Sequence, residues 1–183
     1  MSIPERNNCI HRAGQVLIFC IWVEKRLVDL IVLKEHPRII KKFNQSSSSV
    51  KLPYTFVTER TKLWQKDFSV IKDKFIELFK PSISWKNNLE GICDWRNIIS
   101  HSYISLYRDY ILYRPNGKRK KINRLIKNHI VSRPSNTAKP IQMTLKLSDD
   151  TKYKRILKVI EEFDLVFLKN IAESLGVDYE KIR

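Results

Sequence analysis

Glycine is scarce in this chain, whose 183 residues include only Gly14, Gly91, Gly117 and Gly176. Tight hairpin turns and Gly-rich phosphate loops depend on glycine, because it adopts backbone conformations that other residues reach only with strain. So few glycines argue against an all-β barrel with many tight turns and against either common Gly-rich phosphate loop. The composition therefore favours helices.

Apolar side chains recur at helical spacing in several stretches of the sequence. Pro37 and Pro81 each stop one of these stretches, and Gly176 is a natural residue to follow the last. The pattern predicts helices over about residues 12–36, 57–79, 84–110 and 148–176. The tryptophans fall in or beside the apolar stripes, so we expect all of them in the core: Trp22, Trp64, Trp85 and Trp95.

An irregular region at about residues 110–147 interrupts the helical pattern. Near its end apolar and polar residues alternate, as in one strand, at Ile141, Met143, Leu145 and Leu147. Residues 110–114 are predicted to pair with that strand as a small hairpin. The predicted fold is therefore all-α: a single helical-bundle domain over residues 1–183, with a small β-hairpin or loop insertion before the last helix.

The chain is strongly basic, with 35 Lys and Arg against 19 Asp and Glu, a formal charge of +16. Such a field attracts polyanions, of which nucleic acids are the commonest. A lysine-rich solvated surface is the alternative. Residues 114–139 hold nine basic residues and no acidic one, which makes this segment either an exposed loop or an RNA-binding element. The residues expected to contact RNA phosphates are Lys118, Arg119, Lys120, Lys121, Arg124 and Lys127.

Cysteine and hydropathy patterns exclude several other classes. Cys9, Cys20 and Cys93 form no C-x-x-C pair, so neither a thiolate zinc site of the usual spacing nor a disulfide framework is expected. They are interpreted as small apolar residues in a reducing cytosol. The apolar run at residues 16–23 is far shorter than the ~20 residues that a membrane span needs. We expect a cytoplasmic protein with no membrane contact, no metal and no cofactor.

The third predicted helix carries the candidate catalytic residues Arg96, Asn97 and His101. Asn97 and His101 are four residues apart and so share a polar ridge, which a helical wheel places opposite the core face. Arg96 lies at the border of that ridge, and Tyr103 lies at the edge of the core face, where packing is its default role. A histidine can transfer a proton near neutral pH, and an arginine offers a planar fork of donors to a phosphate. The alternative interpretation of such a ridge is an ordinary solvated surface.

The spacing R-x-x-x-x-H, extended by Tyr103 to R-x-x-x-x-H-x-Y, resembles the motif of the HEPN superfamily (higher eukaryotes and prokaryotes nucleotide-binding). The resemblance implies an all-α HEPN-like bundle and a metal-independent endoribonuclease of a toxin–antitoxin or antiviral defence system. It also implies a two-fold homodimer in which the Arg and His of both copies face one cleft, and RNA products with a 2′,3′-cyclic phosphate. A nucleotidyltransferase-like antitoxin would be its partner, and Tyr103 would be a site of AMPylation.

A second hypothesis comes from another functional class. The chain could be a catalytically inactive HEPN-like module that binds RNA or another protein. Cleavage of RNA in the presence of EDTA separates the two hypotheses, because only the enzyme cleaves without a metal.

Overall fold

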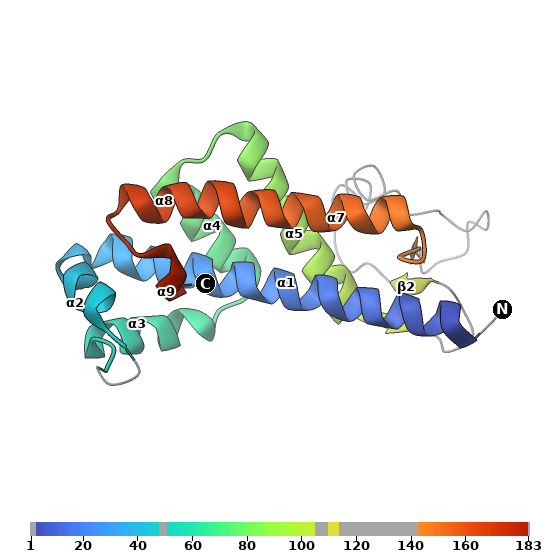
Figure 1. Cartoon of the computed structure of the whole chain (residues 1–183), viewed down its shortest axis with the longest axis horizontal. Helices are drawn as coiled ribbons and strands as arrows, with labels where there is room; N and C mark the ends of the chain where they lie inside the picture. The colour runs from blue at the N-terminus through green and yellow to red at the C-terminus, as the bar shows by residue number, and fades with distance from the viewer. Residues whose placement is uncertain (1–2, 48–50, 105–109, 114–142, 183) are drawn as a thin grey trace. The chain divides into compact units, whose positions relative to one another are not determined.

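A computed structural model describes residues 3–47, 51–104, 110–113 and 143–182, without the side chains of residues 3–7, 104 and 143–144. The chain forms two compact units, each built from segments far apart in the sequence. Unit 1 comprises Met1–Cys20 and Gly91–Val159, and unit 2 comprises Ile21–Glu90 and Ile160–Arg183. The helices are those expected for an all-α protein, and they are accompanied by a small antiparallel sheet (Figure 1). The prediction of an all-α fold with a small β insertion before the last helix is therefore confirmed.

Unit 1 combines the sheet with parts of three helices. The sheet has the strand order β1-β2-β3, with Ser102 opposite Tyr113 and Ile111 opposite Leu145. The predicted hairpin is confirmed as the antiparallel pair β2–β3. The elements concerned are α1 (Ile3–Glu35), α5 (Ile83–Ser100), β1 (Ser102–Ile104), β2 (Ile111–Tyr113), β3 (Met143–Leu145) and α7 (Asp150–Glu162).

The third predicted helix ends ten residues earlier than expected, so the prediction of a helix to Tyr110 was wrong. α5 stops at Ser100, and β1 begins two residues later. Two hydroxyls satisfy carbonyls of the last turn: Ser100 Oγ donates to Arg96 O at 2.6 Å, and Ser102 Oγ donates to Ile98 O. After the helix, the backbone forms the hydrogen bonds of a sheet instead, because β1 pairs with β2. These two effects end the helix.

The start of α7 in unit 1 is capped by the side chain of the preceding residue. Asp149 Oδ1 accepts from the backbone N–H groups of Thr151 and Lys152 at 3.0 and 3.2 Å. Arg12 of α1 donates to the carbonyl oxygens of Leu147 and Ser148, both at 3.0 Å, and so joins the two segments. The start of α7 is therefore held both by its own cap and by α1.

Unit 2 contains several short helices in place of the long ones predicted. The single helix predicted at 57–79 was wrong, because Gln65–Asp67 separates α3 from α4. The helix expected to run to Gly176 passes through a π-helical segment, and Gly176 follows it with a φ of +70°, in the left-handed region as predicted. The elements are the 3-10 turn Pro37–Ile39, α2 (Ile40–Gln45), α3 (Tyr54–Trp64), α4 (Phe68–Phe79), the π-helical segment Phe163–Leu168, α8 (Lys169–Ser174) and α9 (Tyr179–Ile182).

Aromatic rings fill much of the core of unit 2. The Trp85 ring stacks on Phe167 with centroids 4.9 Å apart, and Phe75 contacts Phe79 at 4.6 Å. Trp85 is half-buried, but Trp22 and Trp64 are 48% and 51% exposed, so the prediction that all tryptophans belong to the core was wrong. Their helices bury other faces, since Val23 on α1 and Phe56 on α3 are almost fully covered.

Two ion pairs in unit 2 involve buried carboxylates. Arg26 is paired with Asp164, whose Oδ1 also accepts a hydrogen bond from Tyr179 at 2.6 Å. Asp29 on α1 lies 2.7 Å from Nε of Arg60 on α3. Burial raises the pKa of Asp29 from 3.8 to about 6, although the charges of Arg60 and Lys25 partly oppose that change. The attachment of α3 to α1 therefore includes an ionisable group that titrates near neutral pH.

The remaining class predictions can be compared with the described residues. Cys9, Cys20 and Cys93 are all buried, as expected of small apolar residues, and no disulfide joins them. Within the described parts of the chain, no helix combines the length and apolar character needed to cross a bilayer. The same residues contain no group of three or more His, Cys, Asp and Glu side chains arranged to hold a metal ion.

Candidate catalytic site at the end of α5

Arg96 and Asn97 occupy the last turns of α5, and their side chains contact each other. Arg96 Nη1 donates to Asn97 Oδ1 at 3.4 Å, and Asn97 Nδ2 donates to Cys93 Sγ at 3.7 Å. Both residues are half-buried. The amide of Asn97 therefore bridges a buried thiol one turn earlier and the guanidinium beside it, which restricts where that cation can lie.

His101 is the first residue beyond the helix. Its backbone N–H donates to Asn97 O at 3.2 Å, which continues the helical hydrogen-bond pattern by one step. Its side chain is exposed, and among the described residues the imidazole has no hydrogen-bond partner. The structure thus connects His101 to Asn97 through the backbone, whereas the side chain of Asn97 contacts Arg96. The imidazole is open to solvent and to any ligand that reaches this end of α5.

The polar ridge expected opposite the core is more buried than predicted. Asp94, which lies on that ridge one turn before Asn97, is only 5% exposed, and Asn97 is half-buried. Ile98 and Cys93 are buried as well, so α5 is covered on several sides in unit 1. The prediction of one core face and one opposite solvent face was wrong for this helix. A helical wheel assigns faces from one helix alone and cannot register elements that pack on both sides.

Asp94 and Tyr113 interact electrostatically next to the candidate site, and the sequence patterns did not predict this pair. Burial raises the pKa of the Tyr113 hydroxyl, and the charge of Asp94 raises it further. Tyr113 is on β2, opposite Ser102 of β1, so the strand after His101 brings this tyrosine toward α5. No spacing in the sequence indicates this pair, because Asp94 and Tyr113 are nineteen residues apart and lie on different elements.

Tyr103 is exposed, contrary to the expectation that it packs at the edge of the core. It lies on β1, an edge strand, pairs with Leu112 and is 70% exposed. The expectation failed because it assumed a helix through this residue. In a strand, neighbouring side chains point to opposite faces, and the exposed face carries Tyr103.

The six basic residues expected to contact RNA lie outside the described residues: Lys118, Arg119, Lys120, Lys121, Arg124 and Lys127. Their role stays a prediction. The candidate site is therefore built from the end of α5 and the residue after it.

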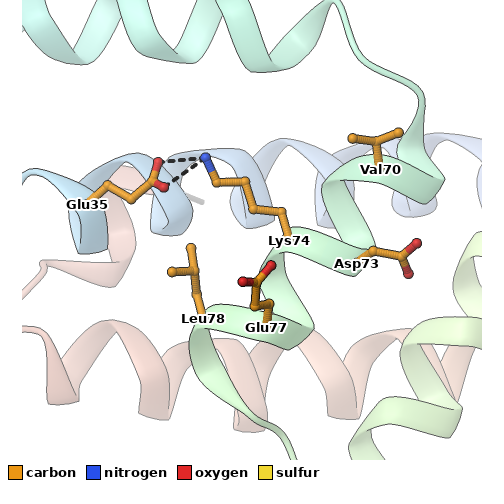
Figure 2. Close-up of a pocket in the computed structure, with 6 residues that line it drawn as sticks. All are labelled: Glu35, Val70, Asp73, Lys74, Glu77 and Leu78. Atoms are coloured by element: carbon orange, nitrogen blue, oxygen red, sulfur yellow. Dashed lines mark hydrogen bonds and ion pairs between the residues drawn. The ribbon is translucent and has the colours of Figure 1, made fainter.

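A groove of about 470 Å³ lies elsewhere, in unit 2, and contains none of the predicted site residues. Figure 2 shows Lys74 extending to Glu35, 2.8 Å away, with Asp73 and Glu77 on the same helix as Lys74. Three of the six residues that line the groove carry carboxylates, which repel a phosphate. It is thus poorly suited to RNA and offers no alternative to the site on α5.

Comparison with protein-family models, with curated proteins and with solved structures gives no match. The chemistry of the site is accordingly argued from its residues. It offers one permanent cation, one amide that holds it and one exposed imidazole, all within six consecutive residues. An arginine is a residue type that binds phosphates, and a histidine is one that transfers protons.

Proposed function

We propose that this protein is a metal-independent endoribonuclease of a toxin–antitoxin or antiviral defence system. The observation that supports it most is the contact between Arg96 and Asn97 one turn before an exposed His101. Arg96 and His101 also have the R-x-x-x-x-H spacing that resembles the motif of the HEPN superfamily. The net charge of +16 also favours a polyanionic substrate.

The proposed reaction uses the ribose next to the cleaved bond as the nucleophile. The 2′-oxygen attacks the phosphorus and the bond to the 5′-oxygen breaks, which leaves a 2′,3′-cyclic phosphate and a 5′-hydroxyl. His101 takes the proton from the 2′-OH or gives one to the leaving 5′-oxygen. Arg96 stabilises the charge that develops on the phosphate, and Asn97 holds Arg96 in place.

A homodimer supplies the second proton-transfer group in this proposal. Two copies of His101 facing one cleft provide a base and an acid, which a single imidazole cannot be at once. The exposure of His101 is compatible with such a shared cleft, because a partner copy or RNA can reach it. A nucleotidyltransferase-like antitoxin and a cytoplasmic location complete the proposed biological setting.

The test is cleavage of labelled RNA in EDTA by the wild type and by His101→Ala. General acid–base groups contribute about 10²–10⁴-fold, so His101→Ala should lose activity by that factor while keeping its fold. Arg96→Ala should be similarly impaired, and Arg96→Lys should not restore activity, because an ammonium cannot replace the planar fork. His11→Ala, which removes another exposed histidine, is the matched control and should cleave normally.

Several results would contradict the proposal. Wild-type cleavage that disappears in EDTA would exclude a metal-independent reaction, and a fully active His101→Ala protein would exclude His101 as the acid or base. An inactive wild type that still binds RNA would favour the catalytically inactive module. If the wild type is fully active and light scattering gives the mass of a monomer, a cleft shared by two copies is excluded.

A further inference from the structure

A second basic segment, residues 38–66, was not singled out by the sequence patterns. It contains seven Lys and Arg residues against one acidic residue, Glu59. All of these cations except the partly buried Arg60 are exposed: Arg38, Lys41, Lys42, Lys51, Lys62 and Lys66. The local excess of positive charge is therefore at the surface, on the 3-10 turn, α2, α3 and the residues next to them.

Helix α3 adds exposed aromatic rings to this charge. Tyr54 is 85% exposed and Trp64 is 51% exposed. At about 100° per residue the two lie within about 80° of each other around the helix, on one stripe with Val57, which is 44% exposed. Their Cα positions are about 15 Å apart along the helix axis, which about four stacked nucleotides span at a rise of ~3.4 Å.

The rest of α3 is anchored, so the stripe is a stable surface. Phe56 is buried and contacts Phe43 of α2 with ring centroids 4.8 Å apart, which places α2 beside α3 (Figure 1). Arg60 is paired with Asp29, and its guanidinium lies 4.4 Å from the centroid of the Trp64 ring. The indole is thereby positioned from one side and remains half exposed.

We propose that α3 and the cations around it form a docking surface for single-stranded RNA, with the bases stacked on Tyr54 and Trp64. Sequence-independent binding of single strands combines these two features, a basic surface that follows the phosphates and aromatic rings that stack on the bases. An apolar protein partner would suit the rings but not the exposed cations Arg38, Lys41, Lys42, Lys51 and Lys66. The surface deepens the proposed function and rests on it for the choice of RNA.

Binding is measured by fluorescence anisotropy of a labelled oligouridylate strand, with the His101→Ala protein so that no strand is cleaved. Stacking contributes about 1–3 kcal/mol per base, so Tyr54→Ala and Trp64→Ala should each weaken binding by about 5- to 150-fold. Trp64→Phe keeps a ring and should restore most of the affinity. Trp22→Ala removes an equally exposed tryptophan from α1 and is the matched control, with binding unchanged.

The charge is tested separately. Lys41→Glu with Lys42→Glu should reduce the slope of log affinity against log salt by at least about 1.4, since each phosphate contact on a single strand contributes ~0.7. Circular dichroism checks folding, and Tyr54→Ala gives the clearest result because its side chain is almost wholly in solvent.

Unchanged affinity in both Tyr54→Ala and Trp64→Ala overturns the proposal, as does a His101→Ala protein that binds no RNA. If Tyr54→Ala or Trp64→Ala converts a dimer to a monomer while RNA binding is unchanged, the proposal is also overturned. The stripe is then assigned to a contact between protein copies. The cleavage assay distinguishes this result from failure of the proposed function. If RNA binding depends on Tyr54 and Trp64 but the wild type does not cleave RNA, the docking surface is supported and the ribonuclease is not. If the wild type cleaves RNA and neither Tyr54→Ala nor Trp64→Ala changes cleavage or binding, the ribonuclease is supported and the docking surface is not.

Discussion

Asp29 makes the stability of this protein depend on pH in an unusual direction. Burial raises the pKa of its carboxyl group from 3.8 to about 6 in the folded chain. Because the folded state then holds the proton more tightly than the unfolded state, protonation of Asp29 stabilises the fold. This contribution is complete below pH 3.8 and is lost as the pH rises through about 6. Acidification from pH 7 should therefore stabilise the protein through this residue.

The size of the effect follows from the interval between the two pKa values. At 1.36 kcal/mol per pH unit, the interval from 3.8 to about 6 corresponds to a free energy on the order of 3 kcal/mol. Asp29 has a side-chain exposure of 3%, so solvent screening does not reduce this figure substantially. The ion pair with Arg60 is already included, since its charge opposes the effect of burial.

Urea unfolding at several pH values between 4 and 7 measures this contribution in the wild type and in Asp29→Asn. The free energy of unfolding of the wild type, minus that of Asp29→Asn, should fall by about 2–3 kcal/mol over this range. All other titrating groups cancel in the difference. Asp73→Asn, which removes a carboxylate with a side-chain exposure of 72%, controls for the loss of one charge.

A difference between wild type and Asp29→Asn that does not change with pH would refute the reasoning. A difference that increases with pH would refute it more strongly, because the ion pair with Arg60 would then outweigh the cost of burial. In that case the pKa of Asp29 would lie below its ordinary value.

Three further predictions concern single hydroxyls and one buried charge. Tyr179→Phe removes a hydrogen bond of 2.6 Å to the buried Asp164 and should lower the free energy of unfolding by about 1.5–3 kcal/mol in urea; a loss below about 0.5 kcal/mol would contradict it. Asp94→Asn should lower the pKa of Tyr113 in a spectrophotometric titration, because a negative neighbour is removed; an unchanged pKa would show that only burial matters. Tyr103→Phe should keep most of the RNA cleavage, because the exposed hydroxyl is proposed as a regulatory target; a loss as large as that of His101→Ala would make it catalytic.

Short-range signals in the sequence determined the helical class and much of the element order. Proline ends helices through its missing N–H and fixed φ, and α1 indeed ends just before Pro37 and α4 before Pro81. Gly176 takes the left-handed conformation expected after a helix. The alternation near residues 141–147 predicted a strand, and β3 forms within this range. Each of these features depends on a residue and its near neighbours, which the sequence contains in full.

Only the tertiary structure decided which side chains are covered. The same helical periodicity predicted a buried Trp64, which is half exposed, and an exposed ridge at Asp94, which is buried. α5 ends at Ser100 because Ser102 begins a strand whose partner, Tyr113, lies eleven residues further on. Burial and pairing of this kind depend on contacts between distant segments, and a pattern within one segment contains no record of them. The charge of +16 predicted a polyanionic partner, but only the fold shows that the rings of Tyr54 and Trp64 on α3 are exposed.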